Sequence, residues 1–144
     1  MRRLEKLFRL PAGDRWLLAR AAVTLGAARL ALWVLPLRVA RRLLARLGPS
    51  ASLHDVPPER IGWAIRVTGR VVPRATCLPQ ALAAEALLAQ GGHPAEFRIG
   101  VVKSERGRLE AHAWVVSGDR IVVGGLQEGL SRYTPLPPLP GPRG

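Results

Sequence analysis

The chain has 144 residues, 48% of them hydrophobic, and carries a formal net charge of +12 at pH 7. This length and apolar content suit one modest domain with a single core and exclude two independent ones. A single cysteine excludes an intramolecular disulfide and a structural zinc site built on several thiolates.

The positive charge is concentrated in the first third of the chain, where the basic residues, nearly all arginine, face only Glu5 and Asp14. This asymmetry predicts an acidic partner, which is nucleic acid, an anionic membrane surface, or an acidic protein or peptide. No recognised nucleic-acid-binding motif accompanies the charge, so we do not expect nucleic acid. The lone cysteine favours a reducing compartment. We therefore expect a cytoplasmic protein, with peripheral membrane association left open.

The first predicted element lies in Trp16–Leu37, the most apolar segment of the chain. Arginines divide it into apolar pieces shorter than the run of about 18 to 20 residues that spans hydrocarbon. We predict an amphipathic helix that begins at Asp14 as N-cap and breaks near Pro36. A second basic helix follows over about Leu37–Leu47. Residues 1–48 thus form a basic helical region that packs on the domain, lies on a membrane or docks a partner.

The predicted core domain, residues 49–134, begins with a connector rich in Gly and Pro that runs to Pro58. A helix is predicted over Ile61–Val72, ending before Pro73. Another runs over Cys77–Gln90, with Thr76 as its cap and a glycine pair as its stop signal.

Beyond this helix the hydrophobic period changes from helical to alternating. We predict three short antiparallel strands, over Phe97–Val102, Leu109–Val116 and Arg120–Val123. The Pro-rich tail, residues 135–144, is expected to continue neither a sheet nor a helix. The predicted fold class is therefore α+β, with a helix packed on a small antiparallel sheet and basic amphipathic helices before it.

Cys77 falls in the first turn of its predicted helix, where backbone N–H groups without intrahelical acceptors and the positive end of the helix dipole stabilise a thiolate. The same N–H groups suit an oxyanion. His112 lies in mid-strand between two alanines, which leave room around an imidazole. Cysteine before histidine is the order of papain-like and transglutaminase-like enzymes, so Cys77 and His112 are interpreted as nucleophile and general base. A buried structural cysteine and a structural histidine are the alternative.

The residue that orients His112 is left open by the sequence. Asp119 follows His112 closely and is the preferred third member, although Gly118 before it indicates a hairpin turn. Glu110 shares a strand face with His112 and is a second possibility. A residue paired across the hairpin would lie near Gly124, which has no side chain, so a backbone carbonyl is the third.

No metal or cofactor is expected. His54 and His93 stand at no ligand spacing to other metal-binding residues and are interpreted as connector and turn residues. The sequence contains no phosphate-binding glycine loop and no dinucleotide fingerprint.

Three motifs occur in order, over Val72–Leu82, Gly92–Gly100 and Ala111–Val115. Together with the basic helices before them and the closing Tyr133–Leu136, they resemble the transglutaminase-like peptidase of lasso-peptide gene clusters. The likeness is to the discrete peptidase half of a split B protein.

The resemblance implies a transglutaminase- or papain-like core and a cysteine peptidase that removes the leader from a ribosomally made precursor peptide. It also implies two partners, a small leader-recognition protein and an ATP-dependent cyclase. The family is described with a Cys-His-Asp triad, so the resemblance makes Cys77 the nucleophile and His112 the base. The third position, Asp119, is where this sequence departs from the family pattern. Acyl transfer, deamidation and a non-catalytic scaffold in a maturation complex remain as alternative functions.

Overall fold

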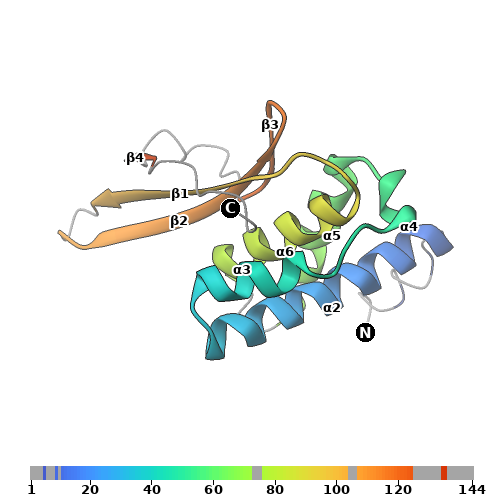
Figure 1. The fold of residues 1–144 in the computed structure, drawn as a ribbon, viewed down its shortest axis with the longest axis horizontal. Coiled ribbons are helices and arrows are strands. Elements are labelled where there is room, and N and C mark those ends of the chain that lie inside the picture. Colours follow the sequence, from blue (N-terminus) through green and yellow to red (C-terminus); the bar gives the residue numbers. More distant parts are fainter. Residues whose placement is uncertain are drawn as a thin grey trace.

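The structure, a computed structural model, describes residues 5, 9, 11–72, 76–103, 107–124 and 134–135. Helices form one layer and pack under one face of an antiparallel sheet whose outer end extends beyond them (Figure 1). This arrangement confirms the predicted α+β class.

The helical layer begins with α2 (Ala12–Val34) and α3 (Leu37–Ala45), which meet at the predicted break near Pro36. The expected N-cap was wrong, because Pro11 takes that position and Asp14 lies inside the first turn. The Asp14 carboxylate instead forms an ion pair with Arg60 of α5 (Pro58–Gly69). A partner distant in sequence therefore determines the role of this carboxylate.

The next two helices differ from the prediction in their bounds. A short helix, α4 (Ala51–His54), interrupts the predicted connector, and α5 begins at Pro58, three residues earlier than expected. Proline fits the first position of a helix because its missing N–H would have no intrahelical acceptor there. Helix α6 (Cys77–Gln90) has the predicted bounds. Thr76 stands at its N-cap, but its side chain makes no capping hydrogen bond.

The sheet has the strand order β3-β2-β1-β4. The three predicted strands are present as β1 (Glu96–Lys103), β2 (Leu109–Ser117) and β3 (Arg120–Val123). The pair β4 (Thr134–Pro135) extends the edge beside β1. The expectation that the tail adds nothing to the sheet was therefore wrong at its first residue, because an edge strand accommodates proline. Residues 136–144 of the predicted tail lie outside the described residues.

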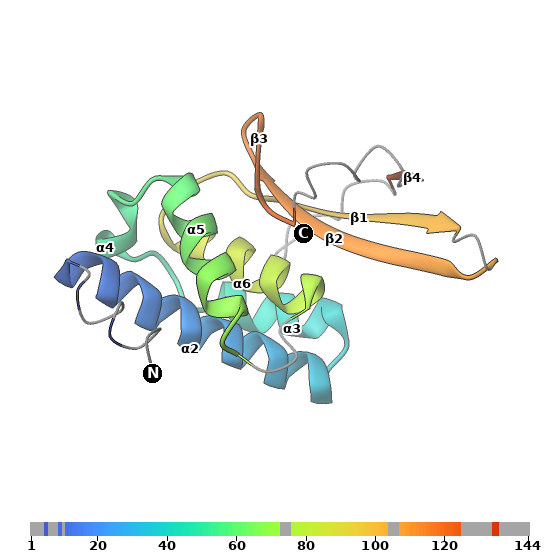
Figure 2. The same ribbon diagram turned by 180° about the vertical axis from the view of Figure 1, so that it is seen from behind.

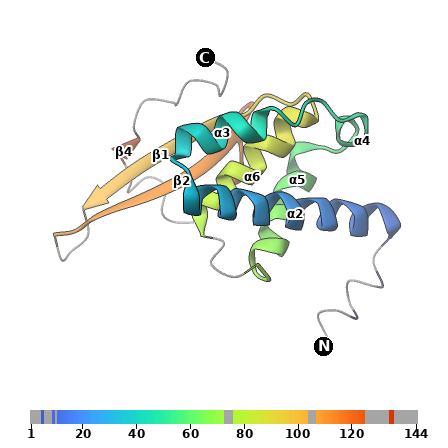
Figure 3. The same cartoon turned by 60° about the horizontal axis from the view of Figure 1, so that its bottom comes forward.

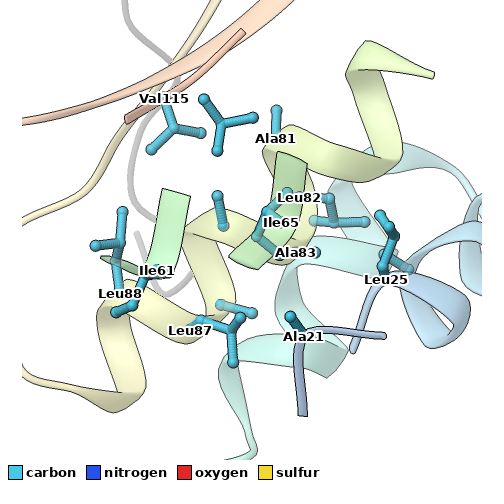
Figure 4. Packing of buried hydrophobic residues seen from close by; sticks show 14 of the residues in the cluster. Ala21, Leu25, Ile61, Ile65, Ala81, Leu82, Ala83, Leu87, Leu88 and Val115 are labelled. Atoms are coloured by element: carbon cyan, nitrogen blue, oxygen red, sulfur yellow. The ribbon is translucent and has the colours of Figure 1, made fainter. Parts of the chain in front are cut away.

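Helix α6 lies at the centre of the core, between the other helices and the sheet (Figures 1 and 2). Eight consecutive residues, from Ala81 to Leu88, are buried. Figure 4 shows Val115 of β2 close to Ala81, with Ile61 of α5 and Ala21 of α2 among the other side chains of the cluster. A helix that is apolar on nearly all sides, with Glu85 as the exception in this run, is stable only when it is enclosed in this way.

The basic N-terminal helices take part in the same core. Buried residues of α2, among them Ala21 and Leu25, join one cluster with those of α5, α6 and the sheet. Helix α2 is long and apolar enough to cross a membrane by length and composition, and a third of its most apolar window is buried in the protein. One face of α2 is therefore packed on the domain, as one of the three alternatives expected.

A buried ion pair joins α3 to α6. Arg41 donates to the carboxylate of Glu85 through Nε at 2.9 Å and Nη2 at 2.6 Å, and the two side chains are only 8% and 7% exposed. The guanidinium also lies over the ring of Phe97 in β1, 5.1 Å from its centroid. This contact fixes the helices relative to the strand that pairs with β2.

Candidate active site

Cys77 is the first residue of α6 and is half-buried against the core. It lies one turn before Ala81, so the two side chains share the face of α6 that is turned toward β2 (Figure 4). In the first turn the N–H groups of Cys77 and Leu78 have no intrahelical acceptor, and Pro79 has no N–H at all. The thiol thus lies at the end of the helix where a developing negative charge is stabilised.

His112 lies in the middle of β2 and is half-buried. Its Nε2 is 2.5 Å from the carbonyl oxygen of Gly124, which follows β3. Since a carbonyl only accepts, Nε2 donates, and in the neutral ring Nδ1 then carries the lone pair that takes a proton. The ring also stacks on Trp114, with centroids 6.1 Å apart and an interplanar angle of 21°. Two contacts therefore set the tautomer and the plane of the imidazole.

Gly124 is required at its position by two separate constraints. Its φ is +85°, in the left-handed region that disfavours a side chain. A Cβ there would also lie 2.5 Å from the carbonyl oxygen of Ala113 and 2.8 Å from the Cβ of Trp114. The chain can pass this close to β2 only as glycine. Of the three groups considered for orienting His112, the structure brings a backbone carbonyl to the ring.

The structure does not bring His112 into hydrogen-bond contact with Cys77. Side chains alternate along a strand, and Ala113 and Val115 belong to the core that faces α6. His112 and Trp114 therefore lie on the opposite face of β2. No hydrogen bond joins the Cys77 sulfur to His112 in the part of the chain that the structure describes. The imidazole of His112 and its acceptor, the Gly124 carbonyl, are therefore in contact, whereas the thiol of Cys77 and the imidazole are not.

Neither predicted carboxylate is observed beside His112. Asp119 is exposed in the turn between β2 and β3, and the strand continues for five residues beyond His112, to Ser117, before that turn begins. At about 3.3 Å per residue, this path places Asp119 more than about 15 Å away from the imidazole. The structure therefore does not bring Asp119 to His112. Glu110 pairs with Val102 through its backbone, and its side chain lies outside the described residues.

The other two histidines have structural contacts. Nδ1 of His54 is 3.3 Å from the carbonyl oxygen of Gly91, and Nε2 of His93 is 2.7 Å from that of Val56. These contacts join the connector to the end of α6. Among the described residues, no group of three or more potential metal ligands is present.

Sequence reasoning missed a cleft beside the N-terminus of α6. It has a volume of about 500 Å³, and its lining includes Leu30 and Trp33 of α2 together with Thr76 and Leu78. Both large apolar side chains are exposed, Trp33 to 82% and Leu30 to 57%. The only signal in the sequence was large apolar residues outside the buried stripe of α2, and that pattern does not reveal which element lies opposite.

The family comparison covers most of the chain. The model of a family described as the transglutaminase-like superfamily matches residues 21–137. The match begins inside α2 and includes Cys77, His112 and Gly124. No curated protein and no solved structure matches the chain.

Proposed function

Because the chain belongs to the transglutaminase-like superfamily, we propose that it is a cysteine peptidase that removes the leader from a ribosomally synthesised lasso-peptide precursor. The observation that carries the proposal is the presence in one fold of a lone cysteine at a helix N-terminus and a strand histidine whose tautomer a carbonyl fixes. Members of this superfamily are generally cysteine peptidases or acyl transferases. The order of the motifs around Cys77 and His112, which resembles lasso leader peptidases, supports the narrower assignment.

In the proposed reaction, His112 takes the thiol proton of Cys77, and the thiolate attacks the scissile carbonyl carbon. The N–H groups in the first turn of α6 hold the resulting oxyanion. Collapse of this intermediate breaks the C–N bond, and the imidazolium donates its proton to the leaving amine. Water, deprotonated by His112, then hydrolyses the thioester, which releases the acid and restores the thiol.

The first step requires the imidazole to approach the sulfur. Among the described strands, β3 pairs with β2 only at Val115–Ser117, so no described strand pairs along this side of β2 at His112. We propose that binding of the peptide across the helix end brings Nδ1 of His112 around this side to Cys77, while Nε2 keeps its contact with the Gly124 carbonyl. Catalytic hydrogen bonds are often long or misaligned without substrate and tighten in the substrate complex.

The proposal includes two protein partners in the cytoplasm, a leader-recognition protein and a cyclase. The face of α2 opposite the core suits docking, because Val23 and Val34 are exposed there. Since the other face of α2 is in the core, deleting the helix would test folding rather than docking. Val23→Glu keeps the core intact and should weaken partner-dependent cleavage. If it instead releases the protein from anionic vesicles without changing cleavage, this face binds a membrane.

The test of the activity is cleavage of the precursor peptide in the presence of the leader-recognition protein, followed by mass spectrometry. Wild type should yield leader and core fragments, and Cys77→Ala and His112→Ala should yield none. His54→Ala, which removes an exposed histidine that contacts the Gly91 carbonyl, is the control and should retain cleavage. Cleavage by the Cys77→Ala variant would refute the mechanism. A product joined to an amine, or a deamidated peptide, would identify the alternative acyl-transfer reactions, and an unreactive Cys77 would indicate a scaffold.

A further inference from the structure

We propose that the cleft between the C-terminal half of α2 and the first turn of α6 is a substrate subsite. It would receive an apolar side chain of the peptide next to the scissile bond, while Arg29 pairs with a nearby peptide carboxylate. This inference rests on the proposed function and specifies the substrate class that the site accepts.

The cleft adjoins the nucleophile directly. Thr76 and Leu78, the two neighbours of Cys77 in the chain, both contribute to its lining. Figure 3 shows the C-terminal end of α2 passing beside the beginning of α6. An extended peptide advances by about 3.3 to 3.6 Å per residue. A peptide with its scissile carbonyl at Cys77 therefore reaches the cleft with a side chain one or two residues away.

The lining chemistry selects an apolar side chain. Leu30 and Trp33 expose large apolar surfaces at the cleft, and covering such surfaces removes them from water. A volume of about 500 Å³ lies within the range of pockets that bind small ligands, so it has room for a large aliphatic or aromatic side chain. The only charged residue in this lining is Arg29, within the part of the chain that the structure describes.

Arg29 has no ion-pair partner among the described residues. A guanidinium at the edge of an apolar cleft forms charge-assisted hydrogen bonds with a carboxylate that is brought to it. This cation therefore favours a peptide with an acidic group, a side chain or a terminal carboxylate, next to the apolar residue. The position beside Cys77 distinguishes this cleft from the apolar pocket between α2 and α5, which also contains an arginine, Arg15, but borders no residue next to Cys77.

The test uses Cys77 as the reporter, since it is the only cysteine of the chain. Alkylation rates are measured by mass spectrometry with chloroacetamide and with N-chloroacetyl-L-phenylalanine, which adds a ring and a carboxylate to the same reactive group. The rate of each reagent with the protein is divided by the rate of the same reagent with free glutathione. The ratio of these two normalised rates reports binding in the subsite. Wild type should prefer the phenylalanine reagent by about tenfold or more, the range that apolar pockets give.

Trp33→Ala and Arg29→Gln should each reduce this preference at least threefold, without changing the rate with chloroacetamide. Trp16→Ala removes an exposed tryptophan at the other end of α2 and is the matched control, which should keep the preference. The proposal is overturned if wild type shows no preference, or if Trp33→Ala and Trp16→Ala give the same ratio. Failure of the proposed function is a separate result, because a weak nucleophile lowers both rates and leaves their ratio intact.

Discussion

Replacing Gly124 with alanine tests whether a backbone carbonyl orients the imidazole of His112. The substitution adds one methyl group, which leaves the hydrogen-bonding groups of the chain unchanged. It should affect the imidazole by displacing the Gly124 carbonyl, whose oxygen lies 2.5 Å from Nε2 of His112.

The size of the effect follows from the local geometry. Alanine at a φ of +85° costs about 1 to 2 kcal/mol of backbone strain. Its Cβ would lie 2.5 Å from the carbonyl oxygen of Ala113, whereas ordinary contact begins at 3.4 Å, so residue 124 must retreat by the difference, about 0.9 Å. The contact to Nε2 then lengthens to as much as about 3.4 Å, beyond the usual hydrogen-bond range. Losing a hydrogen bond of about 1 to 1.5 kcal/mol lowers the cleavage rate about tenfold.

Two assays report this change. The first is kcat/KM for cleavage of the precursor peptide, which should fall about tenfold with little change in KM, because the carbonyl orients the base and does not bind the peptide. The second is a nitrogen-15 NMR spectrum of labelled histidine, in which only three imidazoles contribute. The Nε2–H tautomer of His112 should lose its dominance in Gly124→Ala.

Gly118→Ala is the matched control, because Gly118 also has a positive φ, +63°, but a Cβ there meets nothing within 4 Å. It should cost similar backbone strain and leave both the tautomer and the cleavage rate unchanged. The reasoning is refuted if folded Gly124→Ala keeps the Nε2–H tautomer and the wild-type rate. It is also refuted if Gly118→Ala reduces cleavage equally.

Three further predictions concern stability and the third catalytic position. Glu85→Ala leaves a buried guanidinium without this partner and should lower the free energy of unfolding by about 3 to 5 kcal/mol in urea titrations. Glu96→Ala removes an exposed pair and should change it by less than about 1 kcal/mol. Gly62→Ala forces a Cβ against the carbonyl oxygen of Val122 in β3 and should lower the melting temperature, whereas Gly26→Ala, in open space on α2, should raise it. Asp119→Ala should leave precursor cleavage within about twofold of wild type, and a larger loss would restore Asp119 as the orienting carboxylate.

Several features followed from the sequence because their causes are local. The bounds of Cys77–Gln90 depend on a proline tolerated in the first turn and a glycine pair at the end, all within a few residues of the helix. The strands around His112 follow from alternation of apolar residues. Hairpin counting also brought Gly124 near His112, but the observed register pairs Val123 with Val115, so Gly124 meets the histidine through its carbonyl and not as a paired residue.

The tertiary structure decided the features that join distant segments. The acceptor of His112, the ion pair between Arg41 and Glu85, and the cleft formed by Trp33 and Thr76 each combine elements whose approach no local pattern encodes. The same holds for the face of β2 that meets α6. A shift of one residue in the packed face exchanges the core side chains with His112, and only the packing of the whole core selects between the two faces. The sequence by itself therefore determined which residues can do chemistry, while the packing determined which of them meet.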